Sequence, residues 1–231
     1  MGRAYKAVFF DRDGTLTYFN REKERWRDNI IEQWSGRPFE LPYDKMMTLF
    51  MEASGGKSPW YTCLDDEREF FGRYYRCLLY GEGVRERLEE RADILLRELW
   101  CNDDRVLYPE VVGVLRELYG SGYKLGVISD TSPSLEYTLR QLGVGEYFST
   151  FTASSLVGAG KPDPVIYNAA LTAMGVTAKE SVYIDDCREE AEGAGALGLT
   201  SFWLDRSGEA SGEGIISDLT KVIEFLREHE T

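Results

Sequence analysis

The stretch AYKAVFFDRDGTL, residues 4–16, decides the fold of this chain. It begins as a short apolar run, 4–10, and then changes abruptly to acidic residues and Gly14. A continuous apolar run of this length is typical of a strand that is buried on both faces, as in a parallel sheet. We therefore expect residues 4–10 to form a buried strand, with Asp11 and Asp13 just beyond its carboxyl end.

From about residue 107 onward, apolar runs alternate with segments of helical periodicity. Strands are predicted at 124–129, 147–151, 181–184 and 201–204, with helices after Pro109, after Pro133, over 163–174, up to Gly198 and over 219–226. Strands that alternate with helices build a parallel sheet with helices on both faces. The predicted fold class is therefore α/β, with a Rossmann-like parallel-sheet core.

Residues 17–103 interrupt this alternation. Their apolar residues have helical spacing, and the segment holds four of the five tryptophans of the chain. Aromatic side chains at such spacing favour a separate apolar core, so we expect an all-helical domain without strands. The predicted division is a core of residues 1–16 and 104–231 and an inserted helical domain of residues 17–103.

The composition excludes several classes of protein. The chain carries 27 Lys and Arg against 40 Asp and Glu, a net charge of −13, which disfavours binding to nucleic acid or to anionic lipid. No apolar run is long enough to span a bilayer, and the four cysteines lack a C-x-x-C spacing, so we expect a cytoplasmic protein. The single histidine, His229, excludes catalytic triads and histidine metal sites. Hydrolytic chemistry would have to use carboxylates, lysine, hydroxyls or a hard metal ion.

Polar side chains gather where the predicted strands end, and ligands of open parallel sheets bind beyond the carboxyl ends of the strands. The residues expected at this edge are Asp11, Asp13, Ser129, Asp130, Lys161, Asp185 and Asp186. Carboxylates brought this close repel one another. A hard divalent cation such as Mg²⁺, which prefers oxygen ligands, would make the arrangement favourable.

Four strings of this sequence match an ordered set of motifs. FFDRDGTL, VISD, GKPDP and YIDDCREEAEGAGALG agree in residue type, order and rough spacing with the motifs of the haloacid dehalogenase (HAD) superfamily, which the chain resembles. The resemblance covers the core segments before residue 17 and after residue 104. The insert resembles the helical cap of the branch that contains phosphoglycolate phosphatases and β-phosphoglucomutases.

The resemblance implies catalytic roles for four residues and a substrate contact for a fifth. Asp11 would attack phosphorus and form an aspartyl-phosphate, and Asp13 would protonate the leaving oxygen and later deprotonate water. Ser129 and Lys161 would hold the phosphoryl oxygens. Asp130 stands where the family often has asparagine, and is expected to contact substrate.

The resemblance also implies a Mg²⁺ site. Its ligands would be the side chains of Asp11 and Asp185 and the main-chain carbonyl of Asp13. A further acid would support the metal, with Asp186 favoured over Glu189 or Glu190. Arg12 stands where a small or apolar residue is common, and would either reach solvent or brace the site.

The function predicted from these features is a Mg²⁺-dependent phosphatase that hydrolyses a small phosphorylated metabolite. Asp13 favours the phosphate-handling members of the superfamily, because the dehalogenases lack an aspartate there. The alternatives are a phosphomutase, a phosphonatase with a Schiff-base lysine in the cap (Lys23, Lys45 or Lys57), and a non-catalytic binding protein. The sequence leaves open the substrate and the choice between monomer and homodimer.

Overall fold

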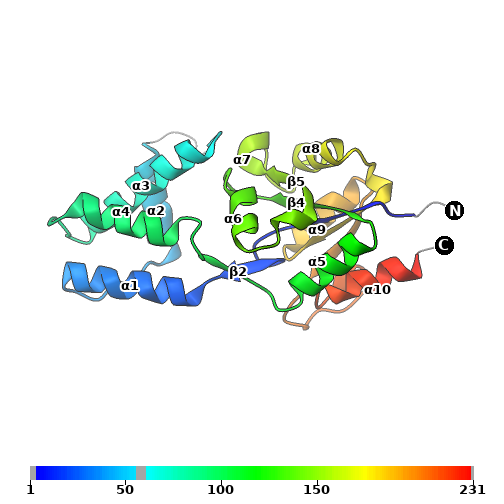
Figure 1. Cartoon of the computed structure of the whole chain (residues 1–231), viewed down its shortest axis with the longest axis horizontal. Coiled ribbons are helices and arrows are strands. Elements are labelled where there is room, and N and C mark those ends of the chain that lie inside the picture. Colours follow the sequence, from blue (N-terminus) through cyan, green and yellow to red (C-terminus); the bar gives the residue numbers. More distant parts are fainter. Residues whose placement is uncertain (1–3, 56–60, 230–231) are drawn as a thin grey trace. The chain divides into compact units, whose positions relative to one another are not determined.

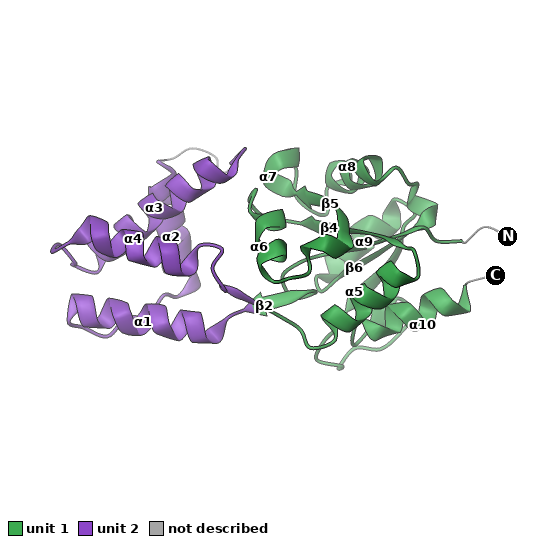
Figure 2. Ribbon diagram, in the orientation of Figure 1, with its two compact units in different colours: residues 1–18, 106–231 green, residues 19–105 purple. Residues whose placement is uncertain are grey.

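The chain folds into two compact units (Figure 2). The structure, a computed structural model, describes residues 4–55 and 61–229. One unit comprises residues 1–18 and 106–231, and the other residues 19–105; both boundaries lie two residues after the predicted ones. No helix in the described part of the chain has the length and apolar character needed to cross a bilayer.

The first unit is built on a six-stranded sheet in the order β5-β4-β1-β6-β7-β8, whose neighbouring strands are all parallel. The strands are β1 (Ala7–Phe10), β4 (Lys124–Ser129), β5 (Phe148–Ala153), β6 (Ser181–Asp185), β7 (Thr200–Leu204) and β8 (Ile215–Ile216). β1 lies between β4 and β6, with Phe10 opposite Val127 on one side and Ile184 on the other. The predicted parallel α/β core is confirmed. β8, with two residues, was not predicted.

Successive residues of β1 pack toward opposite faces of the sheet, as expected for a strand covered on both sides. Val8 and Phe10 belong to the apolar cluster that includes α5 and α10, whereas Ala7 and Phe9 belong to the cluster that includes α8 and α9 (Figure 1). The helices of this unit are α5 (Val111–Gly120), α6 (Leu135–Gln141), η1 (Gly145–Tyr147), α7 (Ser154–Val157), α8 (Pro164–Met174), η2 (Ala178–Glu180), α9 (Arg188–Ala196) and α10 (Thr220–Glu228).

The second unit is helical and has its own apolar core. Its helices are α1 (Arg21–Ser35), α2 (Tyr43–Ser54), α3 (Leu64–Gly81) and α4 (Leu88–Leu99). Ile31, Phe70, Leu78 and Leu95 are fully buried in this core. The expectation of no strand in 17–103 was wrong at one point, because β2 (Thr17–Phe19) pairs with β3 (Arg105–Leu107) where the chain passes between the units. Two strands of three residues each are too short to produce a recognisable apolar pattern.

Candidate active site

The central strands of the sheet bring the predicted acidic residues to one edge. Asp11 follows β1, Ser129 ends β4 and Asp185 ends β6, and these three strands are neighbours in the sheet. Strands that run parallel end at the same edge, which explains why residues far apart in sequence meet there.

Lys161 lies at the centre of this group and is almost completely buried, with 2% of its side chain exposed. Its Nζ donates hydrogen bonds to Oδ1 of Asp11 at 2.7 Å and Oδ2 of Asp185 at 2.8 Å, and it lies 2.6 Å from Oε2 of Glu190. Burial alone would lower the pKa of Lys161, but the surrounding carboxylates outweigh it and hold the pKa well above its usual value. The lysine is therefore a fixed positive charge.

Three carboxylates next to Lys161 form a group suited to a metal ion. One oxygen from each of Asp11, Asp185 and Asp186 lies within 4.8 Å of the others. The main-chain N–H of Cys187 donates to Oδ1 of Asp185 at 2.8 Å, and the Tyr183 hydroxyl donates to Oδ2 of the same carboxylate. These bonds orient Asp185 before any ligand binds.

The carboxylates around Lys161 outnumber the single positive charge of its ammonium group. Burial raises the pKa of Asp11 to about 8; Lys161 opposes this shift, and the charge of Asp185 adds to it. Burial likewise raises the pKa of Glu190 to about 7. A hard divalent cation fits this set of carboxylate oxygens and would supply the charge that Lys161 alone does not.

Asp13 lies outside this carboxylate group and has its own partners. Its Oδ1 accepts a hydrogen bond from the Thr17 hydroxyl at 2.9 Å, and its Oδ2 accepts one from Nη2 of Arg12 at 2.7 Å. Arg12 is 3% exposed, and its Nη2 also donates to the Thr131 hydroxyl at 2.9 Å. Of the two expectations for Arg12, the structure shows the brace: its side chain joins the loop after β1 to the loop after β4.

The loop after β4 contacts the loop that carries Lys161. Ser129 is buried at the end of β4, opposite Ala153 of β5. Both carboxylate oxygens of Asp130 accept from the main-chain N–H of Lys161, at 2.9 and 3.1 Å. Asp130 therefore anchors the backbone that carries the lysine, and its predicted contact with substrate stays a prediction.

The site also contains groups that were not among the predicted catalytic residues. Glu190 lies in the first turn of α9, four residues after Asp186, and contacts Lys161. Asp186 lies before the start of α9, so helical spacing could not have placed Glu190 beside it. Tyr183, two residues before Asp185 on β6, gave no signal because a tyrosine in a buried strand usually serves packing alone.

The structure describes two of the three lysines that were considered for a Schiff base. Lys23 donates to the main-chain carbonyl of Glu98, and Lys45 donates to the carbonyl of Glu40 and pairs with Glu82 at 2.6 Å. Lys57 lies outside the described residues. The two described lysines are thus engaged with groups of their own unit.

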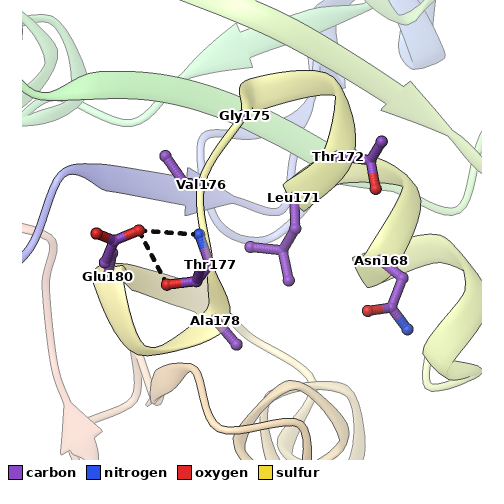
Figure 3. A pocket seen from close by; sticks show the side chains of 8 residues that line it. All are labelled: Asn168, Leu171, Thr172, Gly175, Val176, Thr177, Ala178 and Glu180. Atoms are coloured by element: carbon purple, nitrogen blue, oxygen red, sulfur yellow. Dashed lines mark hydrogen bonds between the residues drawn. The ribbon is translucent and has the colours of Figure 1, made fainter.

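A surface pocket lies at the other end of β6 (Figure 3). It is lined by the last turns of α8, by η2 and by the segment between them, so it is next to Ser181, where β6 begins, rather than Asp185, where β6 ends. Glu180, one of its polar side chains, accepts hydrogen bonds from the main chain and hydroxyl of Thr177. The pocket contains none of the predicted site residues.

Comparison with known proteins shows the family of the chain. Residues 5–198 match the model of the haloacid dehalogenase-like hydrolases. This chain belongs to the haloacid dehalogenase-like hydrolase family. It is accordingly a hydrolase with an α/β fold, as the four sequence motifs predicted.

Several known proteins resemble this chain over most of its length. It is 28% identical to Phosphatase MT3486 of Mycobacterium tuberculosis, over 94% of each chain. It is 27% identical to a glyceraldehyde 3-phosphate phosphatase of Pyrococcus abyssi, over 86% of this chain and 81% of that one. A 2-haloacid dehalogenase from Pseudomonas syringae pv. Tomato superposes on this structure with a TM-score of 0.70 at 23% sequence identity. The superposition covers 97% of this chain and 99% of that chain. At this identity, the likeness shows the fold alone.

Proposed function

We propose that this protein is a Mg²⁺-dependent phosphatase that hydrolyses a small phosphomonoester through an aspartyl-phosphate on Asp11. The observation that carries the proposal is the buried contact of Lys161 with Asp11 and Asp185 at the carboxyl edge of the sheet. It combines a carboxylate that can attack with a fixed positive charge that can attract a phosphate. The relatives that are named phosphatases support the same reaction.

In the first step, an oxygen of Asp11 attacks phosphorus while the bond from phosphorus to the ester oxygen breaks. Asp13 gives its proton to the leaving oxygen, so that an alcohol departs. Lys161 holds Asp11 through Oδ1 and offsets the charge of the transferred phosphoryl group. Ser129, at the end of the adjacent strand β4, would orient the phosphoryl oxygens.

In the second step, Asp13 takes a proton from water, and the water oxygen attacks phosphorus. The bond between phosphorus and Asp11 breaks, which regenerates the carboxylate and releases inorganic phosphate. Thr17 and Arg12 hold the two oxygens of Asp13 and limit its rotation between the two steps.

The cation would be held by carboxylates of Asp11, Asp185 and Asp186 and by the main-chain carbonyl of Asp13. Bound Mg²⁺ lowers the electrostatic repulsion between an anionic nucleophile and an anionic substrate. The remaining charge balance comes from Lys161.

The substrate in this proposal is a small phosphorylated metabolite. One relative is named for glyceraldehyde 3-phosphate, which makes short phosphorylated carbon compounds the first candidates to test. The unit of residues 19–105 would act as the cap that selects among them.

A nucleophile substitution tests the proposal. With p-nitrophenyl phosphate and Mg²⁺, we expect Asp11→Asn to lower kcat by at least about 10³-fold, because an amide cannot form the phosphoenzyme. Asp65→Asn, a change of the same kind at an exposed aspartate of α3, serves as the control and should retain wild-type activity. Circular dichroism would show that both variants are folded. Full activity of the folded Asp11→Asn variant would contradict the mechanism.

A further inference from the structure

Arg206 lies in the loop after β7 and uses all three of its guanidinium nitrogens. Its Nε donates to the main-chain carbonyl of Gly14 at 2.9 Å, and its Nη2 donates to that of Thr15 at 2.6 Å. Its Nη1 donates to Oε1 of Glu110 at 2.7 Å. A residue 191 and 192 positions away in sequence therefore holds two consecutive carbonyls of the turn after Asp13.

The same guanidinium also contacts the segment in which the chain re-enters the first unit. Its Cζ lies 3.4 Å from the centre of the Tyr108 ring, a distance at which the cation stacks on the aromatic face. Tyr108 and Glu110 lie one and three residues after β3, whereas Gly14 and Thr15 lie three and two residues before β2. Arg206 thus joins the departing and the returning segments of the chain.

The turn held by Arg206 supports two acids of the candidate site. The N–H of Gly14 donates to the carbonyl of Thr17 at 2.7 Å, and the hydroxyl of Thr17 donates to Oδ1 of Asp13. The hydroxyl of Thr15 accepts from the main-chain N–H of Asp186 at 3.1 Å. A shift of this turn would therefore move both Asp13 and the backbone of Asp186.

We propose that Arg206 is a positioning residue for the reaction, one that sets the orientation of Asp13 and Asp186 by fixing residues 14–17. The inference rests on the proposed phosphatase function. Arginine suits the task because its planar group can donate in several fixed directions and stack at the same time. Lysine has one ammonium and cannot reproduce this set of contacts.

The test compares Arg206→Met with Arg227→Met. Arg227, an exposed residue of α10, forms one ion pair with Glu117 and is the matched control. We expect Arg206→Met to lower kcat roughly 10- to 100-fold, the effect of displacing a catalytic group by about 1 Å, while KM changes less than about threefold. Arg227→Met should match the wild type. Arg206→Lys should recover a minor part of kcat, and methylguanidinium should raise the kcat of Arg206→Ala.

A second measurement does not depend on catalysis. In Arg206→Met, the amides of residues 14–17 should exchange with deuterium at least about tenfold faster than in the wild type, whereas those of the α1–α4 helices should not change. If Arg206→Met does not fold, the deuterium exchange of residues 14–17 is compared between Arg206→Lys and the wild type instead.

Each outcome decides the proposal. Wild-type kcat in Arg206→Met, or unchanged exchange in residues 14–17, would overturn it. A loss of activity that follows a general fall in Tm, without rescue by methylguanidinium, would show a merely structural role and would also overturn it. If the wild-type protein lacks phosphatase activity, the proposed function fails. The exchange data would then still show whether Arg206 fixes the turn, and unchanged exchange would reject that role separately.

Discussion

At the scale of single residues, Gly14 brings the loop after β1 close to the carboxylate of Asp186. Its φ of +86° lies in the region that favours glycine. A Cβ at this position would overlap the carboxylate of Asp186. Glycine is therefore needed here both for the backbone conformation and for the close approach of an acid.

Gly14→Ala should consequently destabilise the protein and weaken its activity. We expect a loss of about 1–3 kcal/mol in the free energy of unfolding, measured by urea denaturation, because alanine is strained at this φ and displaces Asp186. Gly113→Ala is the control, because Gly113 is an exposed residue of α5 with free space around its Cα, and there alanine should stabilise by up to about 1 kcal/mol. Equal stability of the two variants would contradict the argument.

The residues of the site differ in how far the sequence could predict them. Asp11 and Asp185 could be found because each directly follows a run of apolar side chains, Asp11 just after β1 and Asp185 as the last residue of β6. Arg206 could not, because it stands in a loop rich in Gly and Ser and its hydrogen-bond partners lie 96 to 192 residues earlier. The contact of Glu190 with Lys161 likewise depends on the packing of α9 beside the lysine loop, which no local pattern specifies.

At the scale of elements, the helix that follows the lysine loop shows how local signals fix a helix start. α8 begins at Pro164, and the side chain of Asp163 accepts from the N–H of Val165 at 2.9 Å. An aspartate before a proline at the first helical position is a common helix start. Lys161 lies two residues before Asp163, the N-cap residue of α8. The start of the helix therefore fixes the backbone close to the lysine.

Asp163→Ala should therefore lower the free energy of unfolding by about 1 kcal/mol, because one N–H at the start of α8 loses its partner. Asp163→Ser is the control, since a serine hydroxyl can accept the same hydrogen bond. Thermal unfolding followed by circular dichroism would measure both. A serine variant as unstable as the alanine variant would show that the cap does not account for the loss.

The length of an element decides whether its pattern could be recognised. The five longer strands of the central sheet have four to six residues each, and four of them were predicted within two residues of their observed bounds. The first was predicted at 4–10 but begins only at Ala7. β2, β3 and β8 have three, three and two residues, and the four-residue helix α7 was likewise missed. Such short elements form through tertiary hydrogen bonds, and their own sequence has little period to show.

At the scale of the whole molecule, each unit has an apolar core of its own. The cluster around Ile31, Phe70 and Leu79 consists of residues from the second unit, and the clusters on the two faces of the sheet consist of residues from the first. Units with separate cores can lose stability separately.

Leu79→Ala should reveal this independence. The substitution removes a fully buried side chain and should cost about 2–5 kcal/mol in the stability of the second unit. Hydrogen–deuterium exchange should then increase in α1–α4 far more than in β1, β4 and β6. Leu115→Ala, in the core of the first unit, should produce the opposite distribution. An equal increase in both units for either variant would show that the molecule unfolds as one.

The pairing of β2 with β3 has a consequence for how such a chain can change. The two paired strands bring the ends of an 87-residue insertion, residues 19–105, side by side. The insertion therefore interrupts the backbone of the first unit over only a short distance. An insertion of a different length would change the conformational entropy lost on closing this loop only a little. A different helical segment could therefore be joined to β2 and β3 without rebuilding the parallel sheet of the first unit.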